Sequence, residues 1–272
     1  MDPVIIESNR SLKGVFSDLW DYRELFLFLA WRDLLVRYKQ TAIGLAWSVI
    51  TPLLTMVILT LVFGRIAKLP AGGVPYPILV FAALLPWQFF SSVLTQSSAS
   101  LVNNRNMVSK VYFPRIILPS TQVVVSLTDL FISLVILAGL MGWYGIAPSL
   151  RLLILPLMIG LAILTSLGVG YWISALNVKY RDFRYIVPFM VQFGLYVSPV
   201  GFSSDVIPDS WRLLYSLNPM VGVIDGFRWA ILGGQIELYV NGLACSVLLA
   251  IALFASGLLF FLRTERKFAD VI

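Results

Sequence analysis

Long apolar segments alternate with short polar segments along most of the chain. Six of the apolar segments are close to or above the roughly 20 residues that a helix needs to cross the hydrocarbon core of a bilayer. They lie at about residues 43–63, 77–99, 116–143, 152–176, 185–203 and 240–262. The pattern predicts an all-α integral membrane protein, a single domain over residues 1–272, with six transmembrane helices between about 43 and 262.

Residues 21–39, before the first predicted span, have an amphipathic pattern. Apolar and aromatic residues recur on one side at helical spacing: Leu27, Trp31, Leu34, Leu35 and Tyr38. The opposite side carries Arg32, Asp33, Arg37 and Lys39. The pattern predicts an N-terminal helix that lies in the membrane interface, with its Trp and Tyr rings at headgroup depth. A simple lead-in to the first span is the alternative.

The fifth span and the segment after it depart from a regular pattern. Pro188 and Pro199 interrupt the span, and proline kinks a helix because it cannot donate a backbone hydrogen bond. The following residues 204–239 are too apolar for an ordinary loop, yet hold no run long enough to span. We predict two short re-entrant helices around Asn218-Pro219, which enter the membrane from the outer face and form an outer gate.

Charge patterning predicts the orientation in the membrane. Fifteen of the 20 Lys and Arg residues lie in four clusters, Arg10–Lys39, Arg105–Arg115, Lys179–Arg184 and Arg263–Lys267. The clusters occupy alternate gaps between the predicted spans, and basic loops stay on the cytoplasmic side. A multi-pass protein with both termini in the cytoplasm is therefore expected.

Composition supports a membrane protein and excludes several kinds of site. Hydrophobic residues make up 59% of the chain and charged residues 12%, with a mean hydropathy of +0.87. A soluble domain averages about 25% charged residues. The net charge of +6 reads as orientation signals and contacts with membrane lipid, not with nucleic acid. Histidine is absent and Cys245 is alone, so no metal site, disulfide framework or catalytic residue is predicted.

The chain lacks a recognisable energy source for transport. A phosphate-binding loop needs Gly-Lys followed by Ser or Thr, and no Lys of this chain follows a Gly. An ion-driven carrier places several ionisable residues inside its spans, whereas only Asp129 lies well within one here. We therefore expect a separate chain to supply the energy.

Four motifs resemble the membrane subunit of ABC-2 type exporters, in the branch that moves polysaccharides. They are Phe81–Phe90 (FAALLPWQFF), Asn177–Asp182 (NVKYRD), Ser216–Met220 (SLNPM) and Gly226–Trp229 (GFRW). The resemblance implies two copies of the chain paired in a bacterial cytoplasmic (inner) membrane. Two copies of a separate ATPase, which binds ATP and Mg²⁺, would dock beneath them. The implied substrate is a lipid-linked polysaccharide, with O-antigen ahead of capsule or teichoic acid.

The resemblance also implies roles for two groups of residues. The inner loops would couple the spans to the ATPase, although composition alone fits ordinary basic loops equally well. The coupling residues would be Arg105, Lys110, Tyr112, Phe113, Arg115, Lys179, Tyr180, Arg181 and Asp182. The outer gate would contain Trp211, Asn218, Pro219, Asp225, Arg228 and Trp229. Asp225 and Arg228 are spaced to pair on one helix, where they either steady it or solvate its outer end.

Aromatic and polar residues within the spans suggest a path for a glycan. Sugars pack their CH faces on aromatic rings, and their hydroxyls need polar partners. The candidates for this path are Trp87, Phe89, Phe90, Gln96, Asp129, Tyr171, Trp172, Phe193 and Tyr196. Interfacial aromatic belts and polar contacts between helices are the competing explanations.

The sequence thus predicts a transport subunit, not an enzyme, and leaves alternatives open. Export of a drug or a lipid would use the same architecture. A membrane-embedded enzyme of lipid-linked sugars would need paired acids or a metal site. An ion-coupled carrier would need more buried charge than Asp129 provides.

Overall fold

The fold is described by a computed structural model that covers residues 20–39, 45–180, 182–233, 235–265 and 268. These residues form helices joined by turns and loops, and they contain no β-strand. The predicted all-α class is confirmed.

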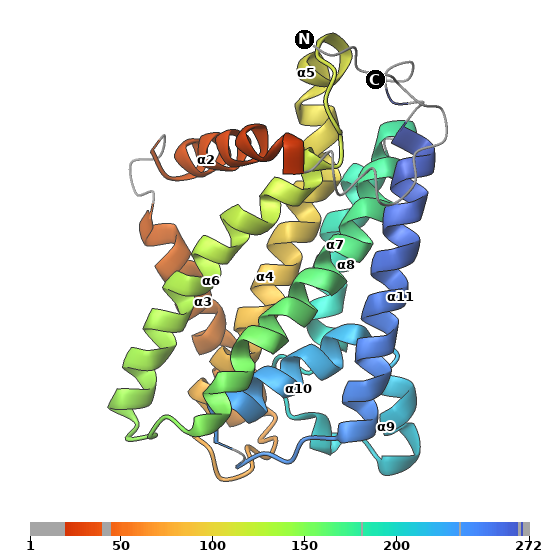
Figure 1. The fold of residues 1–272 in the computed structure, drawn as a ribbon. Helices are drawn as coiled ribbons and strands as arrows, with labels where there is room; N and C mark the ends of the chain where they lie inside the picture. Colours follow the sequence, from red (N-terminus) through yellow and green to blue (C-terminus); the bar gives the residue numbers. More distant parts are fainter. Residues whose placement is uncertain (1–19, 40–44, 181, 234, 266–267, 269–272) are drawn as a thin grey trace.

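Among the described residues, five helices are long and apolar enough to cross a membrane (Figure 1). They are α3 (Leu45–Leu59) with the π-helical turns Thr60–Ile66, α4 (Tyr76–Asn103), α6 (Ile117–Trp143), α7 (Leu155–Lys179) with its leading 3-10 turn Leu150–Ile154, and α11 (Val240–Glu265). The shorter elements are α2 (Arg23–Lys39), α5 (Arg105–Lys110), α8 (Phe183–Val197), a 3-10 turn Ser204–Val206, α9 (Asp209–Tyr215) and α10 (Pro219–Ile231). Five of the six predicted spans coincide with helices of spanning length.

The fifth predicted span, at 185–203, is the exception. Helix α8 has 15 residues and ends at Val197. Ser198 is already extended, with φ −86° and ψ 154°, as expected of a residue that precedes a proline. Fifteen residues rise about 22 Å, less than the roughly 30 Å of a hydrocarbon core. Pro199 thus shortens this element, whereas Pro188 is accommodated inside it.

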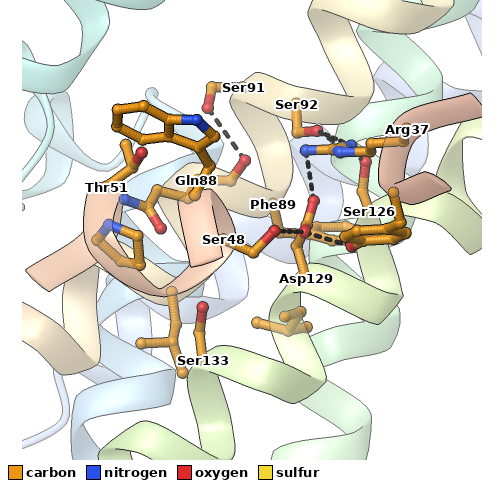
Figure 2. A pocket seen from close by; sticks show the side chains of 15 residues that line it. Arg37, Ser48, Thr51, Gln88, Phe89, Ser91, Ser92, Ser126, Asp129 and Ser133 are labelled. Atoms are coloured by element: carbon orange, nitrogen blue, oxygen red, sulfur yellow. Dashed lines mark hydrogen bonds and ion pairs between the residues drawn. The ribbon is translucent and has the colours of Figure 1, made fainter. Parts of the chain in front are cut away.

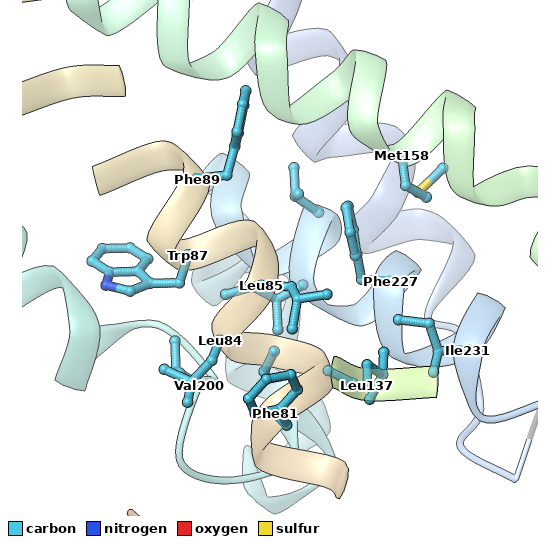
Figure 3. Packing of buried hydrophobic residues seen from close by; sticks show 14 of the residues in the cluster. Phe81, Leu84, Leu85, Trp87, Phe89, Leu137, Met158, Val200, Phe227 and Ile231 are labelled. Carbon is cyan, nitrogen blue, oxygen red and sulfur yellow. The ribbon is translucent and has the colours of Figure 1, made fainter. Parts of the chain in front are cut away.

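Helix α4 forms the centre of the bundle. In its most apolar window 72% of the residues are buried, against 17% to 33% in the other four long helices. Figure 3 shows Phe81 and Leu85 of α4 among Leu137 of α6, Met158 of α7 and Phe227 of α10. The core of a single chain therefore surrounds α4 and leaves much of α3 exposed.

Glycines bring α7 and α11 into backbone contact. A Cβ atom on Gly168 would lie 2.7 Å from the backbone nitrogen of Phe254, and one on Gly257 would lie 2.2 Å from the Gly168 carbonyl oxygen. Likewise, Gly222 of α10 donates its backbone N–H to the hydroxyl of Ser246 at 3.2 Å. These small residues allow the close packing that holds membrane helices together.

The two ends of the bundle differ in character (Figure 1). Helix α5 and the C-terminal ends of α7 and α11 lie at one end, called here the basic end. Helices α9 and α10 lie toward the opposite end, called here the gate end. Helix α2 lies across the bundle near the basic end and runs in a different direction from α3.

Candidate functional site

The segment around α5 combines anchored and exposed residues at the basic end. Arg105 begins α5 and Lys110 ends it. Phe113 is buried in a core cluster shared with α2, α7 and α11, while the neighbouring Tyr112 is 49% exposed. The backbone N–H of Arg115 donates to Oε1 of Glu265 at 2.7 Å, and its guanidinium donates to the Glu265 carbonyl oxygen. This loop is therefore fastened to the end of α11.

The second predicted coupling segment joins α7 to α8. The Lys179 ammonium lies 4.8 Å from the centroid of the Tyr180 ring, which is 46% exposed. Asp182 is exposed at the start of α8, and Arg181 lies outside the described residues. Just before them, the Asn177 amide donates to the Ser98 carbonyl oxygen at 2.6 Å and fastens the end of α7 to α4. Both segments expose an aromatic ring beside basic residues.

Helix α2 turns its charged side toward the bundle. Arg32 donates to the amide oxygen of Asn104 at 3.0 Å, and Asp33 accepts from the Gln122 amide at 2.8 Å. The opposite side, with Leu27 and Trp31 each 62% exposed, faces away from the protein. Helix α2 therefore has its polar partners in the bundle, and its exposed apolar side suits contact with an apolar environment.

Arg37 and Asp129 meet within the bundle, between α2 and the middle of α6. The Arg37 guanidinium lies 2.5 Å from Oδ2 of Asp129. The other carboxylate oxygen accepts from the Tyr38 hydroxyl at 2.6 Å and from the Ser48 hydroxyl at 2.7 Å. Burial raises the pKa of Tyr38 to about 12, and the hydrogen bond to Asp129 acts in the same direction. Tyr38 therefore keeps its proton and remains a donor to the carboxylate.

A pocket of about 330 Å³ lies beside this ion pair (Figure 2). It is lined from four helices, α2, α3, α4 and α6. Ser92 of α4 connects the polar groups of its rim, because it accepts from Gln96 at 2.9 Å and from Ser126 at 3.0 Å. Figure 2 shows Ser48, Gln88, Ser92 and Asp129 around this space, with dashed lines joining the bonded groups.

Sequence reasoning selected Asp129 and missed its polar neighbours on α6. Gln122, Ser126, Asp129 and Ser133 follow one another at intervals of four, three and four residues. This spacing places them on one face of a helix. The signal was present in the sequence as a polar stripe within an otherwise apolar span.

Several residues predicted to line a glycan path are packed inside the chain. Trp87 and Phe89 of α4 are 5% and 2% exposed, and Tyr171 of α7 is 4% exposed and hydrogen-bonded to Ser120 at 2.8 Å. Trp172 stacks on Phe260 of α11 with ring centroids 4.1 Å apart. In this structure these rings stabilise contacts between helices, and their place on a glycan path stays a prediction. Phe89 retains contact with the pocket.

Phe90 and Gln96, also predicted on the path, are half-buried on α4. Phe193 and Tyr196 of α8 are exposed, by 59% and 58%. Phe193 stacks on Phe189 with centroids 5.9 Å apart and an interplanar angle of 10°. Helix α8 thus presents a row of aromatic rings on its uncovered face.

Arg228 of α10 is completely buried toward the gate end. Its Nε donates to the Leu79 carbonyl oxygen at 3.1 Å, Nη1 to that of Phe202 at 2.8 Å, and Nη2 to that of Val200 at 3.1 Å. Asp225 is also buried, and no ion pair joins it to Arg228 within the described part of the chain. The interpretation that these residues solvate the helix end is wrong. Arg228 instead holds α10 to α4 and to the turn after α8.

The other residues predicted for the outer gate lie on α9 and α10 or at the start of α10. The Asn218 side chain caps α10 by accepting from the Met220 N–H at 3.1 Å, and its amide donates to the Ser198 hydroxyl at 2.9 Å. Pro219 occupies the first turn, where a missing N–H has no consequence. Trp229 lies under the Arg151 guanidinium at 4.8 Å, whereas Trp211 of α9 is 60% exposed.

Comparison with known proteins places these features in a family. The model of the ABC-2 type transporter family matches residues 24–232. The O-antigen export system permease protein RfbA of Myxococcus xanthus is 27% identical over 258 residues, 94% of this chain and 98% of the relative. Its namesake in Klebsiella pneumoniae is 27% identical over 256 residues, 92% and 95% of the two chains. The polysialic acid transport protein KpsM of Escherichia coli is 23% identical over 219 residues, 78% and 81% of the two chains. The chain belongs to the ABC-2 type transporter family.

Proposed function

We propose that this chain is the permease subunit of an ATP-driven exporter that moves a lipid-linked polysaccharide, O-antigen foremost, across the bacterial inner membrane. The observation that carries the proposal is similarity over nearly the whole chain to permeases named for O-antigen export. Similarity to a polysialic acid transport protein supports the same substrate class. A partly buried polar network among apolar helices also supports the proposal, because a purely apolar lipid or drug would not require such a network.

The energy comes from a separate ATPase that binds ATP and Mg²⁺. The absence of a Gly-Lys-Ser/Thr loop from the sequence supports this division of labour. Two copies of the ATPase dock on the basic end, against α5 and the α7–α8 loop. The exposed rings of Tyr112 and Tyr180 beside basic residues suit insertion into grooves of a partner. The anchors Phe113 and Asn177 then pass the movement to α11 and α4.

The basic end faces the cytoplasm, with both termini on that side. The concentration of Lys and Arg at this end supports the orientation. Helix α2 lies in the membrane interface with its apolar side toward lipid. Helix α8 and the turn after it form the fifth span, which is incomplete, and α9 and α10 are re-entrant helices that form the outer gate.

Two copies of the chain form the transporter, and the glycan passes along the interface between them. The exposed apolar surface of α3 and the aromatic row of α8 support this arrangement, since both are left uncovered by a single chain. Stacked rings such as Phe189 and Phe193 offer many weak contacts to a sliding polymer.

Deletion of the gene in its host tests the proposal. Surface polysaccharide and intracellular lipid-linked glycan are both quantified, with plasmid-borne wild type as the control. Loss at the surface with accumulation inside is expected. Unchanged glycan in both pools would exclude polysaccharide export and leave a drug or lipid as the substrate.

A further inference from the structure

We propose that the pocket between α2, α3, α4 and α6 binds a sugar unit of the exported glycan within each chain, apart from the path between the two copies. This inference rests on the proposed function, and it adds a defined subsite to it. Residues from four helices of one chain line the pocket, and its polar groups face a space of about 330 Å³. Ligand sites span roughly 300–1,000 Å³, so this one suits a short part of a polymer.

The charges around the pocket favour an uncharged ligand over a phosphate. Arg37 is the single cation among the lining residues, and Asp129 neutralises it at 2.5 Å. Tyr38 and Ser48 donate to the other oxygen of the same carboxylate, so the charged groups of the pocket are already paired with partners in the protein. A phosphate that approached Arg37 would also approach Asp129, and the repulsion would oppose binding in this partly desolvated place.

The pocket offers hydrogen-bonding groups that the protein itself does not satisfy. The side chains of Gln88, Thr51 and Ser133 make no hydrogen bond to another described residue, and all three line the space. The Ser91 hydroxyl donates to the Gln88 carbonyl oxygen at 3.0 Å and keeps its acceptor capacity. An amide and several hydroxyls together provide both donors and acceptors, as a sugar hydroxyl requires.

Aromatic rings complete the match to a carbohydrate. Trp47, Tyr38 and Phe89 line the same space, and Trp47 is 54% exposed. A sugar ring has apolar CH faces and a polar rim, so it can stack on an aromatic side chain while its hydroxyls reach the surrounding amide and hydroxyl groups. A drug-like apolar molecule would leave those polar groups unsatisfied in a low-dielectric setting.

Saturation-transfer NMR on the purified complex of permease and ATPase in nanodiscs tests binding directly. The probes are oligosaccharides of two to four sugars cleaved from the host's own surface polysaccharide. We expect signal transfer to the ring protons, reduced at least fivefold by Gln88→Leu and by Trp47→Ala. Gln235→Leu, an exposed glutamine between α10 and α11, is the matched control and should bind as the wild type does.

Three outcomes would overturn the pocket assignment. Signal that is absent in the wild type would mean that the pocket holds only water, and equal signal in Gln88→Leu would place the sugar elsewhere. Displacement of the oligosaccharide by sodium pyrophosphate at the same concentration would identify an anion site. The membrane levels of Gln88→Leu and Trp47→Ala are measured as a control for misfolding. Binding is compared only for a variant that reaches the wild-type level.

Export in the host separates failure of this inference from failure of the proposed function. The gene is replaced by the Gln88→Leu or Gln235→Leu variant, and the rate at which polysaccharide appears at the surface is measured. We expect the rate to fall at least threefold for Gln88→Leu alone. If deletion abolishes export while Gln88→Leu exports normally, only the pocket assignment fails. If deletion itself changes no glycan, the proposed function fails.

Discussion

Arg228→Met should loosen the gate end more than any other single arginine replacement among the described residues. Arg228 is completely buried, and it donates to three backbone carbonyls from α4 and from the turn after α8. Methionine preserves much of the side-chain length and apolar contact but removes every donor. The replacement therefore tests the hydrogen bonds more than the packing.

The expected magnitude follows from those contacts. Hydrogen bonds to a charged donor contribute about 1.5–3 kcal/mol each, so three set an upper limit of about 5–9 kcal/mol. The cost of burying the guanidinium offsets part of this, so a net loss of about 3–5 kcal/mol is expected. For a chain of this size about 1 kcal/mol corresponds to roughly 2 °C in Tm, so a drop of about 6–10 °C is expected.

The single cysteine provides the assay. Cys245 is half-buried in α11, against which α10 packs, and its reaction with a thiol-sensitive fluorophore reports opening of this region on heating. Arg184→Met, at an exposed arginine near the basic end, is the matched control and should shift Tm by less than about 2 °C. A Tm for Arg228→Met within 2 °C of the wild type would refute the reasoning. It would mean that water or backbone rearrangement satisfies the three carbonyls.

Three further outcomes are expected. Gly168→Val should prevent stable insertion because its side chain would meet the α11 backbone, whereas Gly139→Val, which faces open space, should be tolerated; both are compared by membrane yield. Asp182→Ala should lower export at least fivefold while the purified complex keeps hydrolysing ATP, and equal export would contradict a coupling role. A double-mutant cycle of Arg37→Met and Asp129→Asn, measured by thermal unfolding, should give a coupling energy of about 1–3 kcal/mol, and additive effects would show that the ion pair contributes nothing.

Local signals explain which parts of the fold the sequence predicted. Asn218 followed by Pro219 is a strong helix start, since the asparagine caps the helix and the proline needs no hydrogen-bond partner. The pair of short helices was predicted from it, and α9 and α10 are present. Pro199 likewise signalled an interruption, but the sequence placed the end of the span at 203 instead of 197. The predicted span included Ser198–Ser203 because the segment is apolar overall, although the backbone after Val197 is no longer α-helical.

Contacts between distant segments could not be predicted in the same way. Arg228 bonds to carbonyls of residues 26 to 149 positions away, and backbone carbonyls carry no sequence signal. The aromatic residues of α4 and α7 illustrate the same limit. Trp87 and Phe193 are both apolar rings in apolar segments, yet one is 5% and the other 59% exposed. Which face of a helix is covered depends on neighbours that periodicity within that helix does not identify.

The inward-facing charged side of α2 follows from the solvent in which the chain folds. In water a charged face turns outward, whereas in a bilayer every polar group must find a partner inside the protein. Gln122, Ser126 and Asp129 form a stripe of polar groups on α6 that need partners within the protein. Asp33 and Arg37, one helical turn apart on α2, supply the partners of Gln122 and Asp129. Contact between two polar stripes in an apolar chain is therefore favourable, because each stripe supplies hydrogen-bond partners for the other. Pairing such stripes would have predicted the contact between α2 and α6, and with it the pocket, from the sequence.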